Sequence, residues 1–253
     1  MLRSRITPCL LVHRKGLVKT VEFKEPKYVG DPLNAVKIFN EKEVDELIII
    51  DIDATIEGRG PDFNFIKNIA IESRMPLCYG GGITTVEQAK KIISLGVEKI
   101  ALSSAAIENP QLLFEIGSAI GVQSVVVVLD VKKKGLFKNY EVFTHNGKRS
   151  VGKKLTDIVS TLNNIGVGEI VINSIDEDGK MNGYDFKLFE IMRDLTSFPL
   201  TILGGASSID NIKEAIKRYK PLGVAAGSIF VFKGKYKAVL INYPDRIARN
   251  EIY

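Results

Sequence analysis

The chain has 253 residues, of which 45% are hydrophobic and 26% charged, so it has enough apolar material for a large core and intrinsic disorder is excluded. The formal net charge of +5 is spread along the sequence apart from Lys132–Lys134 and lacks interleaved aromatic residues, which argues against a nucleic-acid-binding protein. The apolar runs are far shorter than a membrane helix, and the first residues show no signal-peptide pattern, so we expect a cytoplasmic protein.

Short runs rich in Val, Ile and Leu alternate with segments of helical periodicity, a pattern typical of β/α units around a parallel sheet. The predicted strands are Ile6–Val12, Glu46–Ile52, Pro76–Tyr79, Lys99–Leu102, Ser124–Val131, Glu169–Asn173, Leu200–Leu203 and Gly223–Ala226. The predicted helices are Pro32–Asn40, Phe63–Ser73, Thr85–Leu95, Pro110–Ala119, Lys154–Ile165, Tyr184–Thr196 and Ser208–Arg218. The turn Asn146-Gly147 predicts a β-hairpin after the fifth strand. Pro244 in the last segment predicts a short or displaced eighth helix.

Cys9 and Cys78 both lie in predicted strands. We expect two buried thiols, with a disulfide as the alternative.

An internal repeat relates the two halves of the chain. Residues 44–53 align with residues 167–176, and the same shift of 123 positions pairs Gly60, Asp62 and Phe63 with Gly183, Asp185 and Phe186. We therefore predict an α/β fold, a single domain over residues 1–253, in which two homologous half-barrels close into a (β/α)8 TIM barrel. The alternative, an open doubly wound sheet, predicts no such repeat and would require a dinucleotide fingerprint that the sequence lacks.

The repeat also duplicates a loop that suits phosphate binding. Glycines after the third and seventh strands let the backbone approach an anion, and small residues follow the fourth and eighth strands. These candidate phosphate-binding residues are Gly81, Gly82, Ser103 and Ser104 in the first half, and Gly204, Gly205, Ala226, Gly227 and Ser228 in the second. A tight strand-to-helix turn explains one such loop equally well, but two related loops predict an elongated ligand with a phosphate at each end.

The sequence resembles the cyclase subunit of imidazole glycerol phosphate synthase over nearly its whole length. The resemblance rests on Leu2-Arg3-Ser4-Arg5-Ile6, Gly30-Asp31-Pro32, Asp45-Glu46-Leu47, Tyr79-Gly80-Gly81-Gly82-Ile83, Ala105–Pro110, Val125–Asp130, Gly168-Glu169-Ile170, Ser174–Gly179, Gly183-Tyr184-Asp185 and Gly204-Gly205-Ala206. It implies a barrel that takes ammonia from a glutaminase subunit at its N-terminal face. The ammonia would pass along the axis to a bisphosphorylated ribonucleotide, giving imidazole glycerol phosphate and an aminoimidazole carboxamide ribotide.

The resemblance also implies site residues. The family uses two aspartates for proton transfer, and Asp130 matches the second, whereas Leu11 stands where the first belongs. His13 is a substitute base to consider. Lys19, in the glycine-hinged loop 14–30, matches a lysine on a mobile loop over the substrate, and Asp176 and Gly179 match phosphate-binding positions. No cofactor and no metal are expected.

Four charged residues stand at the first positions of predicted strands, where their side chains point into the barrel floor: Arg5, Glu46, Lys99 and Glu169. Two positive and two negative charges permit a neutral ring. They match the salt-bridged gate through which the family admits ammonia, and Glu98 matches an acidic contact to the glutaminase. A purely structural charged plug is the alternative.

Three functions follow from this pattern. The first is a specialised paralogue of the cyclase subunit that serves another amidation. Its resemblance is to the branch linked to surface polysaccharides, where an ATP-dependent sugar amidotransferase forms an acetamidino group. The second is an authentic histidine-pathway cyclase, and the third is a non-catalytic scaffold or activator of the glutaminase.

Overall fold

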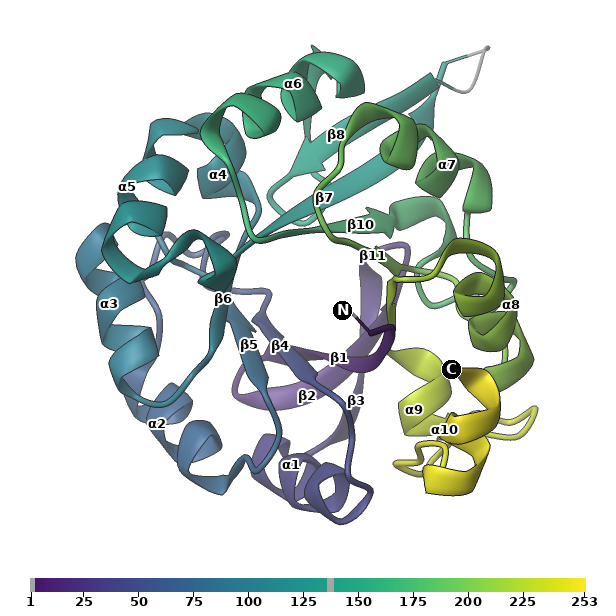
Figure 1. Ribbon diagram of the computed structural model, residues 1–253. Coiled ribbons are helices and arrows are strands. Elements are labelled where there is room, and N and C mark those ends of the chain that lie inside the picture. Colours follow the sequence, from purple (N-terminus) through teal and green to yellow (C-terminus); the bar gives the residue numbers. More distant parts are fainter. Residues whose placement is uncertain (1–2, 136–138) are drawn as a thin grey trace.

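Eight parallel strands close into a barrel with helices around the outside in the computed structural model, which describes residues 3–135 and 139–253 (Figure 1). The barrel strands are β1 (Arg5–His13), β4 (Leu47–Asp51), β5 (Leu77–Gly80), β6 (Lys99–Leu102), β7 (Val125–Lys134), β10 (Glu169–Ser174), β11 (Leu200–Leu203) and β12 (Gly223–Ala226). β12 pairs with β1, and β7 pairs with β10, so the ring of eight barrel strands is closed. The predicted α/β barrel is confirmed.

Helices follow the barrel strands at the places that the periodicity predicted. They are α1 (Pro32–Glu41), α2 (Phe63–Glu72), α3 (Val86–Ser94), α5 (Gln111–Ile120), α6 (Leu155–Ile165), α7 (Phe186–Leu195) and α8 (Ile209–Tyr219). Side chains cap the starts of five of them by accepting a backbone N–H: Asp31, Asp62, Thr85, Asp185 and Ser208. Within the described ranges no helix is long and apolar enough to cross a lipid bilayer.

The strand register reproduces the repeat. Leu47 lies opposite Leu77 in the first half, and Ile170 lies opposite Leu200, 123 positions later, in the second. The helix caps obey the same relation, since Asp62 corresponds to Asp185 and Thr85 to Ser208. The two halves are therefore alike in their backbone pairing as well as in their sequence.

Each half extends its first barrel strand with an antiparallel hairpin. The hairpin predicted at the Asn-Gly turn is present as β8 (Asn139–Thr144) and β9 (Arg149–Lys154), paired to β7. Residues 14–30, which we expected to form a loop, instead form β2 (Gly16–Val21) and β3 (Lys24–Gly30), paired to β1. The expectation of an irregular loop there was wrong.

Short elements that the sequence did not reveal complete the chain: α4 (Ser104–Glu108), the 3-10 helices η1 (Val122–Ser124) and η2 (Ile175–Glu177), α9 (Ser228–Val231), β13 (Phe232–Lys233), β14 (Ala238–Val239) and α10 (Arg246–Ile252). The expected displacement of the last helix is observed, because β13 and β14 separate α9 from α10. The buried Arg249 of α10 donates a hydrogen bond to the carbonyl of Glu43, which fixes this helix to the loop before β4.

Alternation along the strands separates two apolar layers. Leu10 and Val12 of β1 belong to the core between barrel and helices, whereas Cys9 belongs to a smaller cluster with Ile48, Cys78, Ala101, Val126, Val171 and Ala225 inside the barrel. Cys9 and Cys78 are free and buried, as predicted. The axis of the barrel is therefore lined by small and apolar side chains.

Candidate active site

One large cavity, of about 550 Å³, opens where the barrel strands end and continues down between them. Twelve of the thirteen residues that we predicted to be catalytic or phosphate-binding line it: Lys19, Gly81, Gly82, Ser103, Ser104, Asp130, Gly179, Gly204, Gly205, Ala226, Gly227 and Ser228. Cys9, Ile48, Cys78 and Val171 line it as well, so it reaches into the apolar interior of the barrel. In a barrel of this type the active site lies at this end of the strands.

Asp176 is the exception, because it is not among the residues that line the cavity. Its carboxylate accepts a hydrogen bond of 2.7 Å from the backbone N–H of Lys133. The structure therefore places Asp176 as a brace between η2 and β7, and not as a residue that faces the cavity.

Asp130 is a half-buried acid of β7. Asn173 Nδ2 donates to its Oδ1 over 2.9 Å, and Ser103 Oγ lies 3.3 Å from its Oδ2. Burial raises the pKa of Asp130 to about 6, against the lowering effect of these two hydrogen bonds. A carboxyl group in this range exchanges its proton near neutral pH, which suits general acid–base chemistry.

Lys19 reaches from β2 into the opposite side of the cavity. Its Nζ donates a 2.6 Å hydrogen bond to the carbonyl of Cys9 and lies against Gly227, where any side chain would collide with the ammonium group. Burial lowers the pKa of Lys19, while the nearby carboxylate of Asp178 acts in the other direction. The amine is thus placed at the small-residue loop after β12.

Leu11 and Asp130 occupy equivalent positions in the two halves. Leu11 of β1 lies opposite Ile50 of β4, and Asp130 of β7 lies opposite Asn173 of β10, which corresponds to Ile50 in the repeat. Leu11 lines the cavity, so an apolar side chain faces the ligand space where the other half has a carboxyl group. His13 does not compensate, since its Nδ1 is held 2.6 Å from Asp53 and it is not among the residues that line the cavity.

The glycine loops approach neighbouring backbone too closely for a side chain. A Cβ on Gly81 would meet the carbonyl of Asp51, and one on Gly204 would meet the carbonyl of Ser174, the equivalent residue of the second half. Both glycines have positive φ, 121° and 90°. The paired loops leave open backbone facing the cavity, which suits the close approach of an anion.

At the opposite end of the barrel, the four predicted charges form a closed ring of ion pairs. Arg5 lies 2.8 Å from both Glu46 and Glu169, and Lys99 lies 2.7 Å from Glu46 and 3.0 Å from Glu169. Burial alone would raise the pKa of Glu169, but Arg5 and Lys99 hold it below its ordinary range. The ring lies at the base of the apolar interior. Glu98, next to Lys99, is exposed at this end.

Several cavity residues were not anticipated. Arg59 forms a bidentate ion pair with Asp51, with N–O distances of 2.8 and 3.0 Å, beside Gly81. His145 and Asn146 at the tip of the β8–β9 hairpin also line the cavity. The Asn-Gly turn signalled this hairpin but not the direction of its tip. Among the described residues, no group of three or more His, Cys, Asp or Glu side chains could hold a metal ion.

Comparison with known proteins agrees with this geometry. The family model described as "Histidine biosynthesis protein" matches residues 5–237. A provisionally named imidazole glycerol phosphate synthase subunit, hisF3 of Vibrio vulnificus, is 55% identical over 97% of this chain and 94% of its own length. A provisionally named HisF subunit of Leptospira borgpetersenii is 51% identical over the full length of both chains.

More distant relatives include the imidazole glycerol phosphate synthase subunit HisF of Exiguobacterium sibiricum, 37% identical over 91% of each chain. The family match and these relatives each cover most of the sequence. The chain belongs to the HisF-type family of imidazole glycerol phosphate synthase subunits.

Proposed function

We propose that the chain is the synthase subunit of a glutamine amidotransferase complex. A glutaminase bound at the N-terminal face, with Glu98 among the contacts, supplies ammonia to the charged ring. The ammonia passes along the apolar axis to a ligand with two phosphates in the cavity. The observation that carries this proposal is the coincidence of three features on one axis: the ion-pair ring, the apolar interior and the cavity.

The physical chemistry of the axis favours this route. A neutral ammonia molecule crosses an apolar interior at little cost, whereas ammonium would have to lose its hydration. The ring is neutral as a whole, so it offers polar atoms at the entrance without a net charge that would retain a cation. The route leads toward Asp130, which exchanges protons near neutral pH, and Lys19, which binds or polarises the anionic ligand.

We further propose that this subunit serves an amidation other than imidazole formation. Leu11 cannot transfer a proton, and the loss of one positioned acid or base lowers a rate by about 10²- to 10⁴-fold. Relatives with provisional names include proteins 49–55% identical to this chain, whereas HisF subunits named without that qualification include proteins 36–37% identical to it. The resemblance to the polysaccharide-linked branch names the acceptor class: a sugar that an ATP-dependent amidotransferase converts to an acetamidino derivative.

A second candidate is the ordinary cyclase reaction of histidine biosynthesis. The position and the pKa of about 6 of Asp130 favour it, because one of the two required proton-transfer groups is in place. The two proposals differ in the expected rate with the bisphosphorylated ribonucleotide.

The test is a cyclase assay of the chain together with its glutaminase. We expect formation of imidazole glycerol phosphate at least about 10²-fold slower than in an ordinary synthase. A rate within tenfold of an ordinary synthase would refute the specialised role and support the cyclase. If the ligand neither binds nor stimulates glutamine hydrolysis, both proposals fail and a scaffold role is left.

The variant Leu11→Asp restores the missing carboxyl group. We expect it to raise cyclase turnover by at least tenfold, because the equivalent position in the other half already has Asp130. Leu11→Asn is the matched control, since it introduces polarity and similar volume without an acid and should leave turnover low. Equal rates in the two variants would mean that Leu11 is not the limiting difference.

A further inference from the structure

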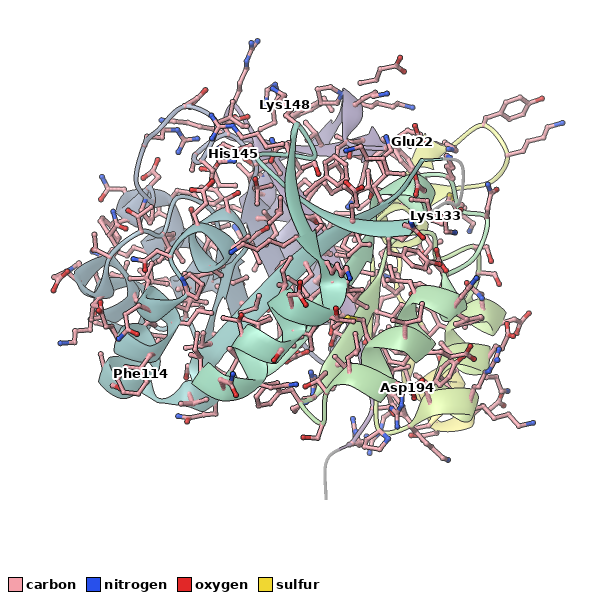
Figure 2. All side chains as sticks on the ribbon, turned by 90° about the horizontal axis from the view of Figure 1, so that it is seen from above. Glu22, Phe114, Lys133, His145, Lys148 and Asp194 are labelled. Atoms are coloured by element: carbon pink, nitrogen blue, oxygen red, sulfur yellow. The ribbon has the colours of Figure 1, made fainter. Side chains whose placement is uncertain are left out.

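The two hairpins cross the mouth of the barrel in opposite directions. On the tip of the β2–β3 hairpin, the N–H of Glu22 donates to the carbonyl of Asp178, after β10 in the second half. On the tip of the β8–β9 hairpin, Asn146 Nδ2 donates over 2.7 Å to the carbonyl of Ile52, after β4 in the first half. In the side view, Glu22, His145 and Lys148 all lie at one end of the barrel (Figure 2). Each half therefore covers the loops of the other.

This crossing makes His145 the counterpart of Lys19. Lys19 lies against Gly227, and the backbone N–H of His145 donates over 3.1 Å to the hydroxyl of Ser104. Ser104 is the residue 123 positions before Gly227, so it is the equivalent position in the repeat. Each hairpin thus brings one basic side chain to the small-residue loop that follows the fourth strand of the opposite half.

The surroundings of His145 are those of a positioned side chain. Its Nε2 lies 3.3 Å from Arg149 Nη1, and its Nδ1 lies 3.6 Å from Glu108 Oε1 and 3.2 Å from Thr144 Oγ1. The side chain is 17% exposed and lines the cavity. His145 and Asn146 have φ values of 53° and 54°, as a tight turn between two antiparallel strands requires, so the turn fixes the direction of the His145 side chain.

We propose that His145 binds the phosphate at the Gly81–Gly82 and Ser103–Ser104 end of the ligand, as Lys19 binds the phosphate at the Gly204–Gly205 and Gly227 end. This inference rests on the proposed doubly anionic ligand and assigns one basic residue to each of its ends. The ligand is then held by two hairpins that come from opposite halves of the barrel.

The test is an NMR titration with inorganic phosphate, which follows the backbone amides of Gly81 and Gly82 at one end and of Gly204 and Gly205 at the other. We expect His145→Gln to weaken phosphate binding at Gly81 and Gly82 by about tenfold, the effect of losing one charge-assisted hydrogen bond, and to leave the other end unchanged. Lys148→Gln is the matched control, because it removes a positive charge from the same hairpin outside the cavity. It should leave both ends unchanged.

A rescue variant provides a second readout. His145→Lys places a positively charged side chain at the same position, near Glu108 and Arg149. It should restore phosphate binding at Gly81 and Gly82 relative to His145→Gln. Binding as weak as in His145→Gln would contradict the assignment.

The outcomes separate this inference from the proposed function. If phosphate shifts both pairs of glycines but His145→Gln changes neither affinity, or weakens both ends equally, the role of His145 is refuted and the two-phosphate ligand stands. If phosphate shifts none of the four amides in the wild type, the two-phosphate ligand is refuted, and the role of His145 falls with it.

Discussion

The hydrogen-bond partners of the Asp130 carboxyl group are the uncharged Asn173 and Ser103. Among the described residues, hydrogen bonds but no ion pair oppose the effect of burial on its pKa. Its equivalent in the first half is the apolar Leu11. A pair of positions that could both hold a carboxyl group thus holds one acid and one leucine. The resemblance to the cyclase family predicted this asymmetry, and the pairing of Leu11 with Ile50 and of Asp130 with Asn173 shows that the two positions are equivalent.

Because burial raises the pKa of Asp130, its ionised carboxylate lowers the stability of the folded protein at high pH. The folded-state pKa of about 6 exceeds the ordinary value of 3.8, so the stabilising contribution is complete below pH 4 and is lost as the pH rises through 6. We expect Asp130→Asn to increase the free energy of unfolding on the order of 2 kcal/mol at pH 8, and by less at pH 5. Denaturant unfolding at the two pH values measures this difference.

Asp194→Asn is the control for that comparison. Asp194 is exposed at the opposite end of the barrel (Figure 2) and should change stability little at either pH. A gain from Asp130→Asn that is the same at pH 5 and pH 8 would show that the ionisation of Asp130 is not its cause.

At the scale of elements, the two hairpins differ in how visible they are in the sequence. Asn146-Gly147 is a common turn signal, and it predicted the β8–β9 hairpin. The β2–β3 turn consists of Glu22 and Phe23, whose φ values of 49° and 62° are unusual for residues with side chains. Contacts to Asp178 and Lys180, far along the chain, hold this turn. Because tertiary contacts stabilise it, local sequence could not reveal it.

The anchoring of the β8–β9 hairpin tip can be measured directly. Asn146→Ala removes the amide that donates to the carbonyl of Ile52, and it should speed amide hydrogen exchange in residues 143–150 about fivefold, as expected for one lost hydrogen bond. Asn163→Ala is the control, since its amide donates to the carbonyl of Leu195 on the outer helices. Unchanged exchange at the tip would mean that other contacts hold the hairpin in place.

For the molecule as a whole, the strand and helix pattern was sufficient to predict the barrel, because alternating β/α units and a twofold repeat leave few other topologies. The positions of Arg5 and Lys99 at strand starts also predicted that they would point into the floor. The individual ion pairs of the charged ring could not be predicted from the sequence, because they depend on the stagger of the strands in the closed barrel. The same limit applies to Asp176, whose place outside the cavity depends on β7.

The ion-pair ring concerns the whole molecule, because it lies at the entrance of the proposed route for ammonia. Lys99→Met leaves Glu46 and Glu169 with Arg5 as their shared partner, so the entrance loses its neutrality and its geometry. In the complex with glutaminase, we expect less product per glutamine hydrolysed, while product formation from added ammonium chloride is retained. The ratio of glutamate to product, with the bisphosphorylated ribonucleotide as assay ligand, measures the coupling.

Two further variants complete that experiment. Lys99→Arg keeps the charge and should keep most of the coupling, and Lys90→Met, on the exposed face of α3, should change nothing. Removing one member of an ion-pair network this buried also costs stability on the order of 3 kcal/mol. An unaltered ratio in a folded Lys99→Met protein would refute the role of the ring as an ammonia entrance.

The crossing of the hairpins has a consequence for any attempt to divide this protein. Neither half contains a complete binding surface, because the hairpin that completes each surface belongs to the other half. In an engineered dimer of two copies of residues 124–253, each copy would have to place its β8–β9 hairpin on the other copy. His145 of one copy would then lie near Gly227 of the other. Deleting this hairpin from one copy would then remove a binding residue from the site of the other copy, while the loops of the shortened copy would stay covered.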